Sequence, residues 1–275
     1  MMKAEDYSQG EAFQAEKRTI FSTAWLPVCA AGQIGQAEDF LSATVGGWGV
    51  VAVRDKAGTI SVLRNACRHQ NMPVVGVPSG TCETFRCRFH GWTYDLAGKF
   101  VTAPAPVAPA DARSPEVNLV SFAVAQEAGL VFFTLAEAEK VLPLTLDVAL
   151  PPYGSTISTD IACNWKVLVE HLLLGQPDEA RDFAWHWPLL ALRRAGALAI
   201  VEQVVPHTFL RTRLLTHVFG GRAEEHKPSG DMIKQACEHL QADRSAGTMA
   251  IDDNALLADF HRQLGAAYAE SPTTT

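Results

Sequence analysis

The chain has 275 residues, with 23 Lys and Arg against 30 Asp and Glu, and therefore carries a formal net charge of −7. This length suggests two domains, and the scattered basic residues argue against binding to nucleic acid or to an anionic membrane surface, since either needs a basic patch. Hydrophobic residues make up 48% of the chain, which excludes disorder over most of its length.

Six cysteines in a chain of this length are too sparse for a disulfide scaffold. The first residues lead into acidic and polar positions, so we expect no signal peptide. No apolar run approaches the roughly 18 residues that span a bilayer. We therefore expect a cytoplasmic protein, in which cysteine paired with histidine indicates a metal site more than a disulfide.

Short β-strands are predicted along the first half of the chain, at residues 50–53, 60–63, 84–86, 92–94 and 129–133. The first two are joined by a turn at 54–58. Residues 102–115 are rich in Pro and Ala and predict an extended loop over the surface.

A second stretch rich in Pro and Gly, residues 150–155, is the predicted domain boundary. It divides the chain into three parts: an N-terminal segment (1–20), a mostly β domain (21–150) and a second domain (151–275).

Helices and strands alternate in the predicted second domain, which makes it α+β. Apolar residues at helical spacing predict a helix from Trp165 that ends before Gly175 and Pro177. Further elements are predicted as strands at 197–205 and 208–219, a polar connection at 220–230, and helices at 232–244 and 253–268.

Two short loops pair one cysteine with one histidine each. Cys67-Arg68-His69 is followed, after seventeen residues, by Cys87-Arg88-Phe89-His90, which gives the pattern C-x-H-x17-C-x2-H. Two cysteines and two histidines bind either zinc or an iron–sulfur cluster. The alternative is that these are four unrelated buried residues that fall at this spacing by chance.

The distribution of ligands favours the cluster over zinc. In a Rieske [2Fe–2S] centre two thiolates hold one iron and two imidazoles hold the other, so that each loop supplies one ligand of each kind. Zinc fingers typically keep their two cysteines in one knuckle and their two histidines on a helix. The spacing therefore favours Cys67, His69, Cys87 and His90 as ligands of a [2Fe–2S] cluster.

The sequence around these ligands resembles Rieske non-haem iron oxygenase α subunits of the ring-hydroxylating type. The string from Cys87 to Gly98, CRFHGWTYDLAG, is similar to the second ligand loop of that family. The Trp25–Val28 string and Asn164-Trp165-Lys166 with Glu170 resemble its opening and its N-W-K-x-x-x-E-N helix. One departure lies in the first loop, where Gln70-Asn71 stands in place of the usual Arg-Gly pair.

The resemblance, which covers about residues 20–268, implies a fold and a reaction. The fold is an N-terminal all-β Rieske domain followed by an α+β helix-grip domain, here smaller than usual. A reductase or ferredoxin donates electrons to the cluster, which passes them to a mononuclear non-haem iron. That iron activates dioxygen for hydroxylation or demethylation, and the subunits assemble into homo- or hetero-oligomers.

The histidines that hold this mononuclear iron in the family have no counterpart in the sequence. Their positions fall at Pro177 or Asp178 and at Asp182 or Phe183. The acidic residue that bridges to a neighbouring subunit is also lost, near Leu174 or Gly175, and His171 replaces the usual asparagine of the motif. A mononuclear Fe(II) site is therefore not indicated by the sequence.

Asp253 is the candidate for a residual third ligand, because Ile251-Asp252-Asp253-Asn254 is similar to the acidic ligand motif of the family. The alternative is that Asp252 or Asp253 caps the last helix. The side chains available to rebuild an iron site are His171, His186, His207, His217, Asp178, Glu179 and Asp182.

Two functions remain open from the sequence. The first is a Rieske oxygenase component that passes electrons from a reductase through its cluster to a non-haem iron, which a partner subunit can supply. The second is an electron-transfer or auxiliary α-like subunit without oxygenase activity of its own.

Overall fold

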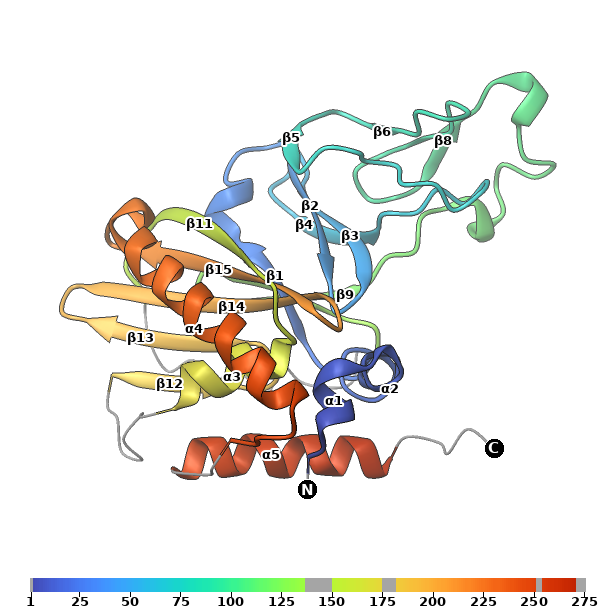
Figure 1. Ribbon diagram of the computed structural model, residues 1–275. Helices are drawn as coiled ribbons and strands as arrows, with labels where there is room; N and C mark the ends of the chain where they lie inside the picture. Colours follow the sequence, from blue (N-terminus) through green and yellow to red (C-terminus); the bar gives the residue numbers. More distant parts are fainter. Residues whose placement is uncertain (1, 137–149, 175–181, 251–253, 271–275) are drawn as a thin grey trace. The chain divides into compact units, whose positions relative to one another are not determined.

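The computed structural model describes residues 2–136, 150–174, 182–250 and 254–270 (Figure 1). The chain forms two compact units, one of residues 28–142 and one that joins residues 1–27 to residues 143–275. The predicted α+β class is confirmed, because strands dominate the first unit and the second combines a sheet with helices. Within the described ranges, no helix is long and apolar enough to cross a membrane.

The first unit is built from short antiparallel strands. Their bounds are β1 Leu26–Ala30, β2 Asp39–Val45, β3 Trp48–Arg54, β4 Ile60–Arg64, β5 Ser79–Thr81, β6 Phe85–Arg86, β7 Thr93–Tyr94, β8 Phe100–Thr102, β9 Ala123–Glu127 and β10 Leu130–Thr134. They form sheets in the orders β4-β3-β2-β5, β6-β7-β8 and β1-β10-β9. Short 3₁₀ turns lie at η1 Ala31–Ile34, η2 Ala105–Val107 and η3 Pro115–Val117.

The hairpin of β3 and β4 confirms the strands and the turn predicted at residues 50–63. Asp55 Oδ1 accepts hydrogen bonds from the backbone N–H groups of Ala57 and Thr59, at 2.9 and 2.8 Å. Gly58 has φ +88°, a left-handed conformation that glycine adopts at little cost. The local side-chain bonds of Asp55 therefore explain why the chain reverses here.

The hydrophobic core of this unit lies directly beneath the candidate cluster ligands. Cys67 and Cys87 are buried in one apolar cluster with Phe85, Trp92 and Tyr94. The rings of Tyr94 and Phe100 pack edge to face with centroids 6.2 Å apart. Burial of the aromatic rings thus fixes the strands that carry the two loops.

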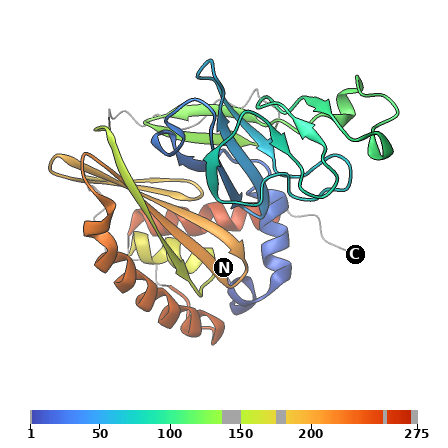
Figure 2. The same ribbon diagram turned by 90° about the horizontal axis from the view of Figure 1, so that it is seen from above.

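The second unit holds a five-stranded antiparallel sheet in the order β11-β15-β14-β13-β12. Its elements are α1 Ala4–Ser8, α2 Gly10–Thr19, β11 Tyr153–Ile161, α3 Trp165–Leu173, β12 Phe183–His186, β13 Leu190–Ala195, β14 Leu198–Thr208, β15 Arg211–Phe219, η4 Ala223–His226, α4 Lys227–Ser245 and α5 Ala255–Ala269. Helices α3 and α4 pack against the sheet (Figures 1 and 2).

Most predicted elements of this unit are confirmed, with three corrections. Helices α1 and α2 and strands β11, β12 and β13 were missed. Strand β11 begins inside the stretch predicted as a boundary, β12 is short, and β13 has two arginines near its end. Helix α4 begins at Lys227, inside the stretch predicted as a polar connection. Helix α5 is capped by Asn254, whose Oδ1 accepts from the Leu257 N–H at 2.9 Å, so the expectation of an Asp252 or Asp253 cap was wrong.

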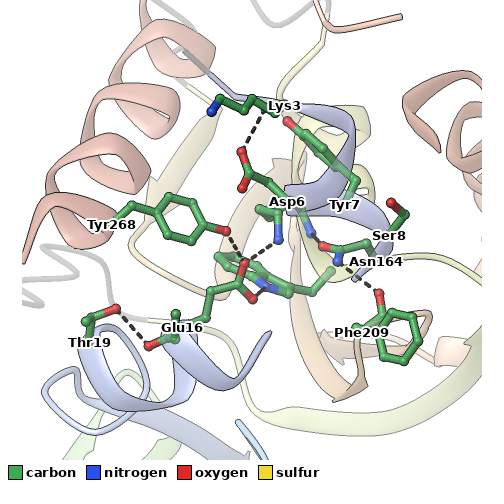
Figure 3. Close-up of polar contacts among 12 residues, drawn as sticks. Lys3, Asp6, Tyr7, Ser8, Glu16, Thr19, Asn164, Phe209 and Tyr268 are labelled. Atoms are coloured by element: carbon green, nitrogen blue, oxygen red, sulfur yellow. Dashed lines mark hydrogen bonds and ion pairs between the residues drawn. The ribbon is translucent and has the colours of Figure 1, made fainter. Parts of the chain in front are cut away.

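Two buried glutamates tie the N-terminal helices to the rest of the second unit. Glu16 of α2 is fully buried and accepts hydrogen bonds from Trp165 Nε1, at 2.7 Å, and from Tyr268 Oη, at 2.5 Å (Figure 3). It also pairs with the buried ammonium group of Lys166. The carboxylate therefore joins α2, α3 and α5 at one point.

Glu170 of α3 makes the second such point. Its carboxylate accepts hydrogen bonds from Tyr7 Oη, from Arg244 Nε at 2.8 Å and from His261 Nε2 at 3.0 Å. Burial alone raises the pKa of Glu170, but these hydrogen bonds and the Arg244 charge outweigh it and hold the pKa below its usual value. The charged carboxylate thus links α1, α3, α4 and α5.

The Glu16–Lys166 pair predicts a strong asymmetry between single and double variants. Lys166→Met leaves a buried carboxylate without its cation, so we expect the free energy of unfolding to fall by about 3–5 kcal/mol. Lys166→Met combined with Glu16→Gln removes both charges and should restore most of that loss. Urea unfolding followed by circular dichroism measures both, and a single variant as stable as the native chain would contradict the role given to the pair.

Candidate metal centre

The two cysteine–histidine loops have the same backbone geometry. In the first loop, between β4 and β5, the Cys67 N–H donates to the Met72 carbonyl at 2.8 Å and the Asn71 N–H donates to the Cys67 carbonyl at 2.7 Å. In the second loop, between β6 and β7, the Cys87 N–H donates to the Trp92 carbonyl at 2.8 Å and the Gly91 N–H donates to the Cys87 carbonyl at 3.0 Å. Each loop is therefore closed behind its cysteine in the same way.

A left-handed residue occupies the same place in both loops. Asn71 has φ +57° and Gly91 has φ +74°. A Cβ atom on Gly91 would lie 3.2 Å from Pro104 Cγ, so glycine also fits the close packing there. Asparagine is among the few non-glycine residues that tolerate this conformation. The Gln70-Asn71 departure from the family pattern therefore keeps the turn that the usual glycine would make.

The four predicted ligands lie together at the end of the first unit. The rings of His69 and His90 have centroids 4.7 Å apart and are nearly perpendicular, at 87°. The Nδ1 atom of His69 is buried and has no hydrogen-bond partner among the described residues. A buried polar atom without a partner needs an explanation, and an iron ion supplies one. The donor set of this site therefore fits a [2Fe–2S] cluster.

Tyr94 supports the first loop from below. Its hydroxyl oxygen lies 3.2 Å from Cys67 Sγ and accepts a hydrogen bond from the Arg68 N–H at 3.1 Å. With that bond accepted, the hydroxyl proton is free to point at the sulfur. Burial raises the pKa of the Cys67 thiol, and the hydrogen bond from Tyr94 acts in the opposite direction by stabilising a thiolate.

Residues 102–117 brace both loops, a role that sequence reasoning missed. Trp92 stacks on the His69 ring at a centroid distance of 5.3 Å and an angle of 10°, and its Nε1 donates to the Val107 carbonyl at 2.7 Å. Arg68 Nε donates to the Glu116 carbonyl at 2.8 Å. The abundance of Pro and Ala predicted a surface loop but not these contacts, since they use backbone carbonyl groups that no side-chain pattern reveals.

Of the positions predicted for the iron ligands, the structure describes only Asp182 and Phe183. Among the described residues, no three His, Cys, Asp or Glu side chains converge as a single metal ion requires. The same finding is compatible with a [2Fe–2S] cluster, whose irons each take two protein ligands. Phe183 begins β12 and carries no ligand atom. Pro177, Asp178, Glu179 and Asp253 lie outside the described residues.

The remaining candidate histidines belong to no group of three metal ligands among the described residues. His217 on β15 is fully buried, with Nδ1 2.7 Å from Thr156 Oγ1 and Nε2 3.0 Å from Gln203 Oε1. Burial lowers its pKa to about 4, so it is neutral at pH 7, and both ring nitrogens already have partners. His171, His186 and His207 lie on α3, β12 and β14 and take part in no such group.

Two buried charge clusters of the second unit were missed by sequence reasoning. One comprises Glu16, Glu170 and their partners, and the other is an ion pair between Arg193 and Glu202, whose Nε and Oε2 atoms lie 3.0 Å apart. The only signals were Trp165, Lys166 and Glu170 of the N-W-K motif, which marks these residues without naming their partners.

The left-handed turn at Asn71 gives a test of the first loop. Asn71→Gly should leave iron content and thermal stability close to those of the native chain, because glycine adopts the same φ freely. Asn71→Val should lose the cluster or lower the melting temperature markedly, since β-branched residues strongly disfavour this conformation. Iron analysis and thermal unfolding of both variants measure this, and equal behaviour of the two would contradict it.

Comparison with known proteins places these loops in a known domain. The family model described as the Rieske [2Fe-2S] domain matches residues 24–123. The α subunit of benzene 1,2-dioxygenase from Pseudomonas putida is 30% identical over 182 residues, which cover 60% of this chain and 40% of that protein. The α subunit of biphenyl dioxygenase from Metapseudomonas furukawaii is 28% identical over 186 residues, covering 60% and 41%. The match thus spans about two fifths of these relatives.

Solved structures with a similar fold cover nearly the whole chain. The apo form of the quaternary ammonium Rieske monooxygenase CntA has a TM-score of 0.79 at 17% identity, over 98% of this chain and 95% of that chain. Naphthalene 1,2-dioxygenase with indole bound has a TM-score of 0.63 at 15% identity, over 98% and 80%. At these identities the likeness concerns the fold. The chain thus carries a Rieske [2Fe-2S] domain and, as its motifs predict, is a homologue of ring-hydroxylating dioxygenase α subunits.

Proposed function

We propose that this chain is an electron-transferring subunit of a Rieske oxygenase, which takes electrons from a reductase or ferredoxin and delivers them to a mononuclear iron on a partner α-type subunit. The observation that carries the proposal is the contrast between its two units. The first presents two matched loops with a complete cysteine–histidine set, whereas the sequence of the second has Pro177 or Asp178, and Asp182 or Phe183, where the iron-binding histidines are expected.

In this proposal Cys67 and Cys87 bind one iron of a [2Fe–2S] cluster, and His69 and His90 bind the other. A bound cluster supplies reversible one-electron transfer. The chain's own residues hold the ligands in place: Tyr94 donates a hydrogen bond toward the Cys67 sulfur, and the plane of Trp92 fixes the orientation of the His69 ring. Such supporting contacts keep the ligands in position during electron transfer.

The surface around the loops suits an acidic electron donor. Arg68, Arg86 and Arg88 are exposed beside the two histidines. Between them, Phe89 keeps 55% of its surface exposed. A basic rim around an exposed aromatic residue favours encounter with a partner of opposite charge and gives it an apolar contact.

The second candidate function is an auxiliary subunit that relays electrons without any oxygenase partner. The same lack of the expected iron-binding histidines in the sequence favours it. The two candidates differ in whether a partner's iron receives the electron, so they are separated by experiment below.

Metal content tests the cluster and its ligands. Purified under anaerobic conditions, the chain should contain two irons and two acid-labile sulfides, with a Rieske signal in electron paramagnetic resonance after reduction. Cys87→Ser and His90→Ala should abolish that signal. Cys82→Ser, a half-buried cysteine packed against the same core, is the matched control and should retain it. Three irons per native chain would contradict the placing of the mononuclear iron on a partner.

Electron delivery to a partner tests the oxygenase role. An α-type subunit is prepared with its iron ligands intact but with its own cluster cysteines replaced. When it is mixed with this chain and its reductase, it should regain substrate-dependent oxygen uptake. The chain alone should be reduced without consuming oxygen in a substrate-dependent manner. Rapid reduction together with no rescue of any co-purifying α-type subunit would favour the auxiliary relay instead.

A further inference from the structure

A cavity of about 460 Å³ lies in the second unit between the sheet and helices α3 and α4. This volume falls within the roughly 300–1,000 Å³ typical of small-molecule sites. The lining includes the apolar side chains of Leu174, Ile200 and Ile233. It also includes the polar side chains of His171, Arg193, Glu202, Thr216 and His226. On the sheet, Ile200 stands opposite Arg193 and two residues from Glu202, so apolar and charged groups lie side by side on one face of the cavity.

The charged groups of the cavity are organised around one buried carboxylate. The side chain of Glu202 is 8% exposed, and its Oε2 accepts a hydrogen bond from Arg193 Nε at 3.0 Å. The Arg193 guanidinium lies over the Phe183 ring, 5.7 Å from its centroid, and its side chain is 38% exposed. The bond to Glu202 uses Nε, which leaves the two terminal nitrogens of Arg193 without a hydrogen-bond partner among the described residues.

Further polar groups of the cavity lining have unused hydrogen-bonding capacity. Thr216 stands directly opposite Glu202 in the register of β14 and β15. Its hydroxyl and the imidazoles of His171 and His226 make no hydrogen bond within the described part of the chain. Burial raises the pKa of Glu202 in spite of its bond to Arg193, so the carboxylate is incompletely compensated. A ligand that completes these interactions is therefore favoured.

The charges of the cavity decide the class of ligand. Arg193 and Glu202 carry opposite charges in direct contact. A simple cation is therefore repelled by Arg193, and a simple anion is repelled by Glu202. A zwitterion satisfies both when its own charges are as close together as theirs. Of common small molecules, an α-amino acid has this spacing, because its ammonium and carboxylate groups share one carbon. Its side chain then faces Leu174, Ile200 and Ile233.

We propose that this cavity binds a free α-amino acid with an apolar side chain, its carboxylate at the terminal nitrogens of Arg193 and its ammonium group at Glu202 and Thr216. The Arg193–Glu202 bond persists in the complex, since each partner uses atoms not engaged in it. The site requires neither the cluster nor a mononuclear iron. It therefore goes beyond the proposed electron transfer and stands or falls separately from it.

Four matched probes test the charge arrangement on the purified full chain with its cluster oxidised. Norleucine carries both charges on one carbon, and hexanoate and pentylamine each lack one of them. The isomer 6-aminohexanoate carries both charges at opposite ends. Titration calorimetry should show norleucine binding at least about tenfold more tightly than the other three, as expected when one charge-assisted contact is lost. Equal or absent binding of all four would overturn the proposal.

Two charge variants identify the site. In Glu202→Gln, norleucine should lose its advantage and hexanoate should bind at least as well. In Arg193→Gln, pentylamine should gain in the same way. If either single variant fails to fold, Arg193→Gln combined with Glu202→Gln leaves no buried charge unpaired and should bind norleucine no better than hexanoate or pentylamine. Unchanged selectivity in the variants that fold would overturn the assignment.

The exposed ion pair between Arg213 and Asp160 supplies the control. It has the same chemistry, with Arg213 Nε 2.7 Å from Asp160 Oδ1, but it lies on β15 and β11 outside this cavity. Arg213→Gln should leave the affinity and selectivity for norleucine unchanged. Loss of selectivity in this variant as well would mean that the net charge of the chain, and not the cavity, governs binding.

Discussion

Two loops separated by seventeen residues must each present a sulfur and a nitrogen to one small volume, and much of the first unit meets this constraint. The same pair of backbone hydrogen bonds closes each loop behind its cysteine. The same left-handed turn follows, made by Asn71 in one loop and Gly91 in the other. The aromatic core beneath, with Tyr94 and Trp92, fixes the strands from which both loops extend. The metal chemistry therefore depends on backbone geometry as much as on the four ligands.

In the second unit, several buried polar groups are fully engaged with other groups of the protein. The carboxylates of Glu16 and Glu170 are buried but meet cations and hydroxyl donors from several helices. His217 likewise has a partner at each ring nitrogen. Metal binding needs ligand atoms that are not already engaged in hydrogen bonds, and at these positions the capacity is used for stability. Other groups of this unit keep unused capacity: His186 Nε2 and His207 Nε2 are buried without a partner among the described residues, and Arg193 and Glu202 keep unused atoms that face a cavity.

How far the sequence predicts these features depends on the distance along the chain between interacting residues. The ligand loops were predictable, because cysteine and histidine lie two or three residues apart within each loop. The partners of Glu16 were not, since Trp165 and Tyr268 are separated from it by 149 and 252 positions. The Arg193–Glu202 pair depends on strand β13, whose two arginines hide its β character. The cap of α5 was misplaced because three consecutive residues, Asp252, Asp253 and Asn254, all make good N-caps.

The departures from the family pattern have unequal consequences. Asn71 in place of glycine is conservative in the physical sense, because φ +57° is retained and the loop keeps its shape. The second position expected for an iron-binding histidine falls at Asp182 or Phe183. The Phe183 ring offers no ligand atom and packs against the Arg193 guanidinium instead. The Arg193 guanidinium, paired with the Glu202 carboxylate, therefore lies in the cavity between the sheet and helices α3 and α4. Its charge is already balanced by Glu202, which favours net-neutral ligands over a bare metal ion.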